Sequence, residues 1–350
     1  MIFAARLIVL GSLNMDISVT VPDLPVPGAT VLGRAAVFAP GGKGANQAVA
    51  AARLAADSGM SVAMIGCTGD DEFGRTLRAA LQAEGVDDGA VRTVPGVPTG
   101  IAMITVDRSG ENMITVAPGA NHAVNAADVA HVAAAGPAAP APAVSGPAVS
   151  GRGTAADAAP STNPATPSAH RDVLVISAEV PVPVIAAALA ATSGRTLQVL
   201  NLAPAPPEAA DLVAAGPDWL VVNESEAAAV LGRPVAGLAE AADAAVALVA
   251  AGARNAVVTA GAAGAAYCAQ DEAVTVPGFK VTAIDTVGAG DTFVGALAVA
   301  LAAGVPPVAA VTAAAAAGAA AAARPGTQSG MPRPADVLAV TGHRWPVQAR

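Results

Sequence analysis

The stretch Ala283-Ile-Asp-Thr-Val-Gly-Ala-Gly-Asp-Thr-Phe293, followed by an apolar helical run from Val294 to Ala303, is the most informative part of this 350-residue chain. It places a glycine-rich turn at the start of a helix, with a carboxylate, Asp291, inside that turn. Free backbone N–H groups and the positive end of the helix dipole can bind phosphate oxygens there, while the carboxylate accepts a proton from an alcohol. The stretch therefore predicts a site that transfers a phosphoryl group to a hydroxyl.

Six short β-branched runs precede this stretch, and each is followed by a turn and then by a helix-like segment. The runs are Leu7–Leu10, Val62–Ile65, Val173–Ile176, Leu197–Leu200, Trp219–Val222 and Ala256–Thr259. This alternation is typical of an α/β fold with a mostly parallel central sheet and helices on both faces. Ligands bind beyond the carboxyl ends of the strands in such sheets. The turns at those ends contain Asn14, Asp16, Glu179, Asn201, Asn223, Gly261 and Asp291.

Two extended segments interrupt the alternation, because no helix separates their strands. They are Asp16–Phe38 and Gly100–Val116, and the second carries a hairpin signal at Asp107–Glu111. We expect them to form a small β-sheet that projects from the core as a lid, built from about residues 12–40 and 97–120.

The chain is expected to form a single domain over residues 1–350, interrupted by one atypical tract. Ala135–Ala169 is rich in Ala, Pro, Ser and Gly and shows no apolar period. Such a composition does not bury enough apolar surface to fold. It predicts a disordered surface insertion at about residues 135–170.

The composition argues against several partners and locations. A formal net charge of -9 disfavours nucleic acid, which usually requires a basic face. The apolar start, Met1–Leu10, is short and broken by Arg6, so no signal peptide is predicted. Val308–Ala323 is shorter than the ~20 residues of a membrane span, which predicts a buried helix and no membrane partner. Cys67 and Cys268 are expected to be buried thiols in a reducing compartment, and the predicted location is the cytoplasm.

Other chemistries lack the residues that they need. Lys43 and Lys280 are the only lysines, and neither is followed by Ser or Thr, which excludes a Walker A phosphate loop. The four histidines show no metal-ligand spacing with the cysteines, which argues against catalytic zinc. No G-x-S-x-G elbow occurs, so a serine hydrolase would have no nucleophile.

A second glycine-rich turn, Gly41-Gly-Lys-Gly-Ala-Asn46, opens a predicted helix that runs to about Ala56. Its glycines would let another molecule approach the backbone, and Lys43 and Asn46 offer polar side chains at the start of the helix. The alternative is an ordinary strand-to-helix turn. A dinucleotide fingerprint is excluded because the third glycine of G-x-G-x-x-G is absent.

Polar residues also follow other predicted strands. Asn14 and Asp16 lie near the end of the first strand, where an amide and a carboxylate can bind the vicinal hydroxyls of a sugar; a turn cap is the alternative. Glu179 follows another strand, in a position where an acidic residue is usually solvated.

The turn at Asn223-Glu-Ser-Glu226 can orient water molecules around Mg²⁺, and it can equally be a capping box; the two interpretations are compatible. Thr259-Ala-Gly-Ala-Ala-Gly264 is a further glycine-bearing turn that suits contact with a nucleotide, although the signal is weak by itself.

Taken together, these residues resemble the ribokinase family of PfkB-type carbohydrate kinases, over nearly the whole chain except Ala135–Ala169. The motifs that carry the resemblance are Gly-Ser-Leu-Asn-Met-Asp at 11–16, Gly-Gly-Lys-Gly-Ala-Asn-Gln-Ala at 41–48, Cys-Thr-Gly-Asp-Asp at 67–71, Gly-Glu-Asn at 110–112, Pro-Gly-Ala-Asn at 118–121, Asn-Leu-Ala-Pro-Ala at 201–205, Asn-Glu-Ser-Glu at 223–226 and Asp-Thr-Val-Gly-Ala-Gly-Asp-Thr-Phe at 285–293.

The resemblance implies a ribokinase-like fold with a small β-lid, often shared across a homodimer. It implies ATP as the phosphoryl donor, Mg²⁺ as the essential metal, K⁺ as an activating cation and the 5-hydroxyl of D-ribose as the acceptor. By position, Asp291 would be the catalytic base, and the anion hole would be the backbone of Gly288, Ala289, Gly290 and Asp291.

The remaining roles are carried over residue by residue. The sugar would be bound by Asn14, Asp16, Gly42, Lys43, Asn46 and Glu179, together with Asp291. The nucleotide would be bound by Asn223, Thr259, Ala260, Gly261, Ala262, Ala263, Gly264 and Gly290, with Glu226 on Mg²⁺ through water. The monovalent cation would be held by Asp285, Val287, Ala321, Arg324, Gly326 and Gly330. Gly330 stands where the family commonly has a serine, which puts that last ligand in doubt.

Two alternatives remain open at this stage. A nucleoside kinase of the adenosine type would share the fold, but Lys43, Asn14 and Asp16 favour a free sugar, since a nucleoside base requires apolar or aromatic surface. A sugar-binding sensor that has lost transfer is disfavoured by the intact Asp291 and the turn before it.

Overall fold

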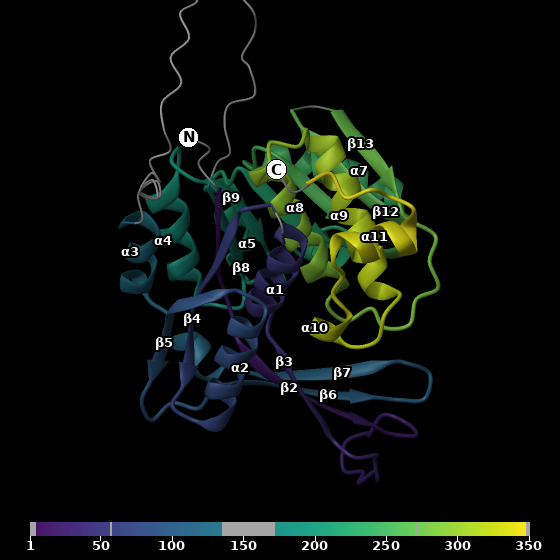
Figure 1. Ribbon diagram of the computed structural model, residues 1–350. Coiled ribbons are helices and arrows are strands. Elements are labelled where there is room, and N and C mark those ends of the chain that lie inside the picture. The colour runs from purple at the N-terminus through teal and green to yellow at the C-terminus, as the bar shows by residue number, and fades with distance from the viewer. Residues whose placement is uncertain (1–4, 57, 135–171, 271, 348–350) are drawn as a thin grey trace, which may run out of the picture.

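The computed structural model describes residues 5–56, 58–134, 172–270 and 272–347, and these form two β-sheets with helices around the larger one (Figure 1). The strands of the larger sheet are β1 (Arg6–Leu10), β4 (Ser61–Gly69), β5 (Asp87–Val94), β8 (Val173–Ser177), β9 (Leu197–Asn201), β10 (Trp219–Asn223), β11 (Ala256–Thr259), β12 (Gly264–Ala269) and β13 (Glu272–Pro277). Those of the smaller sheet are β2 (Asn14–Thr20), β3 (Val37–Gly41), β6 (Gly100–Val106) and β7 (Asn112–Ala117).

The helices lie on both faces of the larger sheet. They are α1 (Lys43–Ala55), α2 (Glu72–Ala83), α3 (Ala126–Ala134), α4 (Val182–Thr192), α5 (Ala209–Ala214), α6 (Glu224–Leu231), α7 (Gly237–Ala250), α8 (Ala289–Ala302), α9 (Pro307–Ala322), α10 (Thr327–Gly330) and α11 (Pro334–Thr341). Side chains alternate across β1: Leu7 and Val9 join the core under α1, α8 and α9, while Ile8 and Leu10 join the core under α4 and α7. The predicted α/β fold class, with a mostly parallel central sheet, helices on both faces and a small additional sheet, is confirmed.

The order of the strands places a switch point at the centre of the sheet. The larger sheet runs β13-β12-β11-β10-β9-β8-β1-β4-β5, and all neighbours from β11 to β5 are parallel. The chain proceeds from β1 towards β5 on one side and from β8 towards β11 on the other, so the direction of winding reverses between β1 and β8. Ligands bind beyond the carboxyl ends of the strands at such a point, which here means next to Gly11 and Ala178.

All six predicted strands are present, but the sequence did not identify β5, β12 and β13. Asp16–Phe38 takes part in two strands with no helix between them, as predicted, although residues 21–36 form no strand. Prolines 22, 25 and 27 explain the break, since proline cannot donate a ladder hydrogen bond. The predicted insertion at 135–170 lies outside the described residues.

The smaller sheet runs β3-β2-β6-β7 and extends from the lower side of the core (Figure 1). It leaves apolar side chains exposed, including Phe38, Met103, Ile114 and Val116. Its strands lie within the two segments for which the sequence predicted a lid, while its role as a lid stays a prediction.

The Ala-rich segment near the carboxyl end forms α9, as predicted, and nine of its residues are buried. Cys67 and Cys268 are buried free thiols, also as predicted. Across the described part of the chain, no helix combines the length and the apolar character that crossing a bilayer requires.

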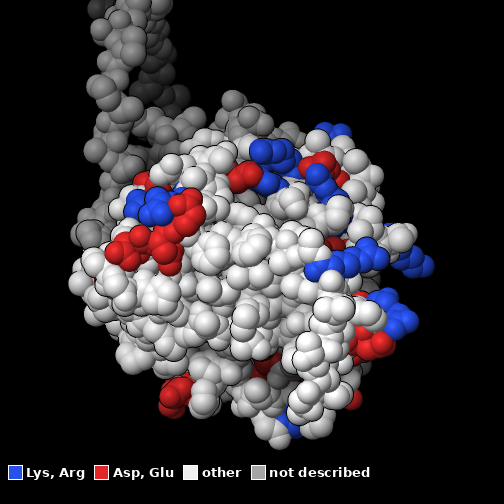
Figure 2. All heavy atoms as spheres, turned by 90° about the horizontal axis from the view of Figure 1, so that it is seen from below, with Lys and Arg blue, Asp and Glu red and all other residues white. Residues whose placement is uncertain are grey.

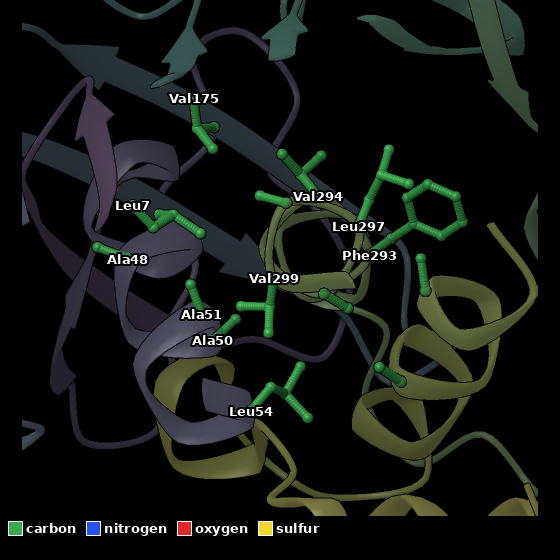
Figure 3. Close-up of a cluster of buried hydrophobic side chains, with 14 of the residues drawn as sticks. Leu7, Ala48, Ala50, Ala51, Leu54, Val175, Phe293, Val294, Leu297 and Val299 are labelled. Carbon is green, nitrogen blue, oxygen red and sulfur yellow. The ribbon is translucent and has the colours of Figure 1, made fainter. Parts of the chain in front are cut away.

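Helix α8 packs against both α1 and α9, and small residues let α1 approach it closely. Figure 3 shows Ala50 and Ala51 of α1 facing Val299 of α8 in this core. A Cβ added to Gly295 of α8 would lie 2.7 Å from the Gln47 carbonyl oxygen and 2.9 Å from Ala50 Cβ. The separation of the two helices therefore depends on the absence of a side chain at Gly295.

We predict that Gly295→Ala lowers the free energy of unfolding by about 1 to 3 kcal/mol, because α1 must shift to admit the methyl group. Urea denaturation measures this change. Gly290→Ala is the matched control: it lies on the same helix, and its Cβ would meet nothing within 4 Å. Equal stability of the two variants would contradict the prediction.

Candidate active site

Asp291 occupies the first turn of α8, after Gly288, which adopts a φ of 79° as the N-cap. The sequence placed this residue inside the preceding turn, whereas the helix already begins at Ala289. Its carboxylate is buried and accepts two hydrogen bonds, from Asn46 Nδ2 to Oδ2 at 2.9 Å and from Gln47 Nε2 to Oδ1 at 3.1 Å. The carboxylate is thus oriented by α1 and does not turn into solvent.

The backbone N–H groups of the predicted anion hole are only partly available. The N–H of Ala289 donates to the Thr286 carbonyl at 3.2 Å. Among the described residues, no acceptor is found for the N–H groups of Gly288, Gly290 and Asp291. Three free donors therefore remain at the positive end of α8, where they suit an anion.

A cleft of about 210 Å³ opens beside these donors and gathers many of the predicted site residues. Its lining consists of Lys43, Asn201, Ala203, Val221, Val222, Asn223, Glu226, Thr259, Thr286, Gly288, Gly290, Asp291 and Val294. A larger hollow of about 400 Å³ between α2 and β5 contains none of the predicted site residues, so size alone does not identify the site.

Three carboxylates and one lysine form an electrostatic cluster at the edge of the cleft. Burial raises the pKa of Asp16 to about 7, and the negative charges of Glu179 and Asp291 act in the same direction, against Lys43. The charge of Asp291 raises the pKa of Lys43 above its usual range, and burial opposes it. The cluster therefore surrounds the positively charged ammonium group of Lys43 with three carboxyl groups that interact with it.

Two of the predicted sugar-binding side chains are partly engaged within the protein. Glu179 Oε2 accepts hydrogen bonds from Ser12 Oγ and from the Lys43 N–H. Asn14 Oδ1 accepts from Asn121 Nδ2 at 2.7 Å. Ser12 and Asn121 were not identified as site residues, although both lie in motifs that the sequence analysis quoted. Only their partners, more than 100 residues away, reveal their role.

Asn46, which was also predicted to bind the sugar, makes hydrogen bonds within the protein as well. Its Nδ2 donates to Asp291, and its Oδ1 accepts from Gln328 Nε2 of α10 at 3.0 Å. One N–H of the amide remains for a ligand.

The glycines before α1 serve internal packing as well as the site. A Cβ on Gly42 would lie 2.6 Å from the Asn14 nitrogen, and one on Gly44 would lie 2.6 Å from Ser12 nitrogen. The sequence explained these glycines by the approach of another molecule. In the structure they let α1 begin directly against the turn after β1, which brings Lys43 to the switch point.

The turn at Asn223 is a capping box. Asn223 Oδ1 accepts from the Glu226 N–H at 2.9 Å, and Glu226 Oε2 accepts from the Asn223 N–H at 2.8 Å. Burial raises the pKa of Glu226. Both residues line the cleft, so the structural role leaves them beside it.

The predicted nucleotide turn divides into two parts. Thr259 lines the cleft, and Gly261, Ala262 and Ala263 are exposed. Ala260 and Gly264 are buried, and a Cβ on Gly264 would strike the backbone at the end of β13. This glycine is required for packing in the β12–β13 hairpin.

The residues predicted to hold a monovalent cation come from two loops that the structure joins. The Asp285 carboxylate accepts from the N–H groups of Val287 and Gly326, each at 3.0 Å. A Cβ on Gly330 would lie 3.3 Å from the Arg324 carbonyl oxygen and 3.2 Å from that of Pro325, so two carbonyls converge there. The carbonyls of Ala321 and Gly326 accept hydrogen bonds from within the chain.

Possible metal ligands in the described residues and charged side chains on one face of the molecule are scattered. Within the described ranges, no group of three or more His, Cys, Asp or Glu residues is arranged to hold a metal ion. On the face seen in Figure 2, charged side chains of both signs form separate small groups with uncharged surface between them.

Comparison with known proteins gives one consistent result. The model of the pfkB family of carbohydrate kinases matches residues 4–334. The ribokinase of Schizosaccharomyces pombe is 35% identical over 308 residues, which cover 86% of each chain. The solved ribokinase of Thermotoga maritima superposes with a TM-score of 0.76 at 27% identity, covering 96% of this chain and 99% of its own. The ribokinase of Arabidopsis thaliana, solved with ribose and ATP, gives a TM-score of 0.76 at 26% identity, with 97% and 99% covered.

We predict that Asp16→Asn stabilises the protein at high pH and has little effect at low pH. The pKa of Asp16 is about 7 in the folded protein and about 3.9 in an unfolded chain, so the native state binds this proton more tightly. Stability from this group is present below about pH 4 and is lost as the pH rises to about 7. The gain at pH 8 should be about 1 to 2 kcal/mol after allowance for partial exposure. Melting temperatures of both proteins at pH 4 and pH 8 measure it, and a difference independent of pH would refute it.

Proposed function

We propose a reaction from one premise: the chain belongs to the pfkB family of carbohydrate kinases. The protein is therefore an ATP-dependent sugar kinase, and we assign D-ribose as its acceptor because the relatives that it matches are ribokinases. The reaction transfers the γ-phosphoryl group of ATP to the 5-hydroxyl and gives D-ribose 5-phosphate, ADP and a proton. The observation that carries the proposed phosphoryl transfer is the buried Asp291 carboxylate beside three free N–H groups.

Asp291 acts as the general base in this proposal. A sugar hydroxyl is a poor nucleophile at neutral pH, and a positioned base contributes about 10²- to 10⁴-fold to the rate. Asn46 and Gln47 each occupy a lone pair of the carboxylate, and the remaining lone pairs can receive the hydroxyl proton. As the proton leaves, the oxygen attacks phosphorus, and the bond to ADP breaks.

The free N–H groups of Gly288, Gly290 and Asp291 stabilise the charge on the transferring phosphoryl group. We propose this set in place of the four residues suggested by the family pattern, because the N–H of Ala289 already has an acceptor. The positive end of α8 adds to the same field.

The sugar is bound on the side of Asn14, Asp16, Lys43 and Glu179 in this proposal. Carboxylates accept hydrogen bonds from vicinal hydroxyls, and the Lys43 ammonium donates to sugar oxygens. Gly42 and Asn46 complete the sugar site, as the family pattern implies. The nucleotide is placed along Asn223 and Thr259 in this proposal, with the exposed Gly261, Ala262 and Ala263 beside them.

Mg²⁺ and K⁺ fit the residues present. Mg²⁺ keeps most of its water and needs few protein carboxylates beside the phosphates, and Glu226 in the cleft would hold it through water. It would neutralise charge on the phosphates. K⁺ would lie among Asp285 and the carbonyls of Val287, Ala321, Arg324 and Gly326. We add the Pro325 carbonyl to this set because it converges with that of Arg324 at Gly330, which contributes no side-chain ligand.

The exposed apolar strands β6 and β7 support the proposal that two copies pair through the lid, because Met103, Ile114 and Val116 are unprotected in one chain. The cytoplasmic location stays a prediction.

We predict that Asp291→Asn folds normally and binds ribose, but loses at least about 10²-fold in kcat, because the amide cannot accept the hydroxyl proton. A coupled assay of ADP release measures turnover, and ribose affinity is measured separately by calorimetry. Turnover close to that of the unchanged enzyme would remove Asp291 from the base role.

We predict that ADP release depends on a pentose and is highest with ribose in a panel that includes 2-deoxyribose and adenosine. Faster release with adenosine would favour a nucleoside kinase, and release that no sugar stimulates would favour a sensor. Replacing K⁺ by Na⁺ should lower turnover, and Asp285→Ala should abolish that difference.

A further inference from the structure

We infer that Gln47 is a positioning residue that fixes the carboxylate of Asp291 for catalysis, through a hydrogen-bonded chain that begins at the backbone of β10. The inference deepens the proposed function and rests on the role of Asp291 as the base. Gln47 needs no contact with the sugar or the nucleotide for this role.

The chain of hydrogen bonds is continuous and buried. Asn201 Nδ2 donates to the Val221 carbonyl at 3.1 Å, and Asn201 Oδ1 accepts from Gln47 Nε2 at 2.9 Å. The other N–H of Gln47 Nε2 donates to Asp291 Oδ1 at 3.1 Å. Gln47 and Asn201 are both almost fully buried, with exposed fractions of 0% and 6%.

The direction of donation along these hydrogen bonds is fixed by the backbone carbonyl of Val221. A backbone carbonyl only accepts, so Asn201 must present its Nδ2 to Val221 and its Oδ1 to Gln47. Gln47 must then present its Nε2 to Asn201, and the same nitrogen reaches Asp291. If the Gln47 amide turned over, its oxygen would face two acceptors, Asn201 Oδ1 and Asp291 Oδ1.

The opposite end of the Gln47 amide supports a functional role. Gln47 Oε1 is buried and meets no donor within the described residues. A buried oxygen without a donor lowers the stability of the folded protein. The Gln47 side chain keeps this unfavourable arrangement while both of its N–H groups donate to Asn201 and Asp291.

Asn46, the other donor to Asp291, is not connected to the backbone of the sheet in this way. Its Oδ1 accepts from Gln328 Nε2, a side chain of the four-residue helix α10. Gln47 is therefore the donor whose direction the sheet determines.

Gln47→Met tests the inference, because methionine has a similar length and lacks the donor. We expect kcat to fall about 10- to 100-fold, since a small displacement of a reacting group has an effect of that size. The KM values for ribose and ATP should change less than about twofold, because neither substrate loses a contact.

Gln198→Met is the matched control. Gln198 is also a buried glutamine, and its Nε2 donates to the Leu189 carbonyl and to Thr192 Oγ1, away from the cleft. Its variant loses comparable hydrogen bonds, and we expect its kcat to stay within about twofold of the unchanged enzyme.

Two double variants separate positioning from other roles. In the Asp291→Asn background, Gln47→Met should lower the residual kcat less than twofold, since no carboxylate remains to be positioned. Asn201→Leu should lower kcat by itself, and adding Gln47→Met to it should give a kcat no lower than that of Gln47→Met alone. The single variant Asn201→Leu also tests the hydrogen-bonded series if Gln47→Met does not fold.

The outcomes distinguish this inference from the proposed function. An unchanged enzyme that phosphorylates no sugar overturns both. If the unchanged enzyme is active and Asp291→Asn is not, then a Gln47→Met kcat equal to that of Gln198→Met overturns the positioning role alone. A raised KM with unchanged kcat would instead assign Gln47 to substrate binding, and would equally overturn it.

Discussion

The contact between α1 and α8 is the constraint on which the rest of the site depends. Two amides in the first turns of α1 reach a carboxylate in the first turn of α8, and this is possible only because Gly295 and the alanines of α1 let the helices approach. Both helices begin at the switch point of the sheet, so Lys43 at the start of α1 and the free N–H groups of α8 lie at the same cleft. Helix packing thereby fixes the direction of the Asp291 carboxylate, while the first turn of α8 itself carries both the base and the anion hole.

The electrostatic cluster shows a different constraint, because it opposes stability. Lys43 is the first residue of α1, where the helix dipole disfavours a positive charge. The carboxylates of Asp16, Glu179 and Asp291 compensate for that position, and burial in turn raises the pKa of Asp16. Such competing charges are common where a ligand replaces water and satisfies them. We therefore interpret the cluster as arranged for a polyhydroxylated ligand.

The sequence predicted the parallel sheet because buried strands such as Val173–Ser177 are continuous apolar runs. It did not predict β5, an edge strand whose residues Asp87, Asp88 and Arg92 are polar, nor the β12–β13 hairpin. Within the site, the glycine-rich motifs indicated Asp291 and Lys43 because their chemistry is local. Gln47 stood in the motif at 41–48 but received no role from the sequence, because its partners Asn201 and Asp291 lie 154 and 244 residues away.

The two glycine-rich motifs therefore combine packing with chemistry, and a sequence pattern does not separate them. Gly42 and Gly44 place α1 against the turn after β1. Lys43, between them, lines the cleft, and the side chains of Asn46 and Gln47 donate to Asp291. A side chain at either glycine would move the amides and the base together. Loss of activity in such a variant would then report displacement of the carboxylate and not loss of a contact with the substrate, and only a separate measurement of sugar binding distinguishes the two.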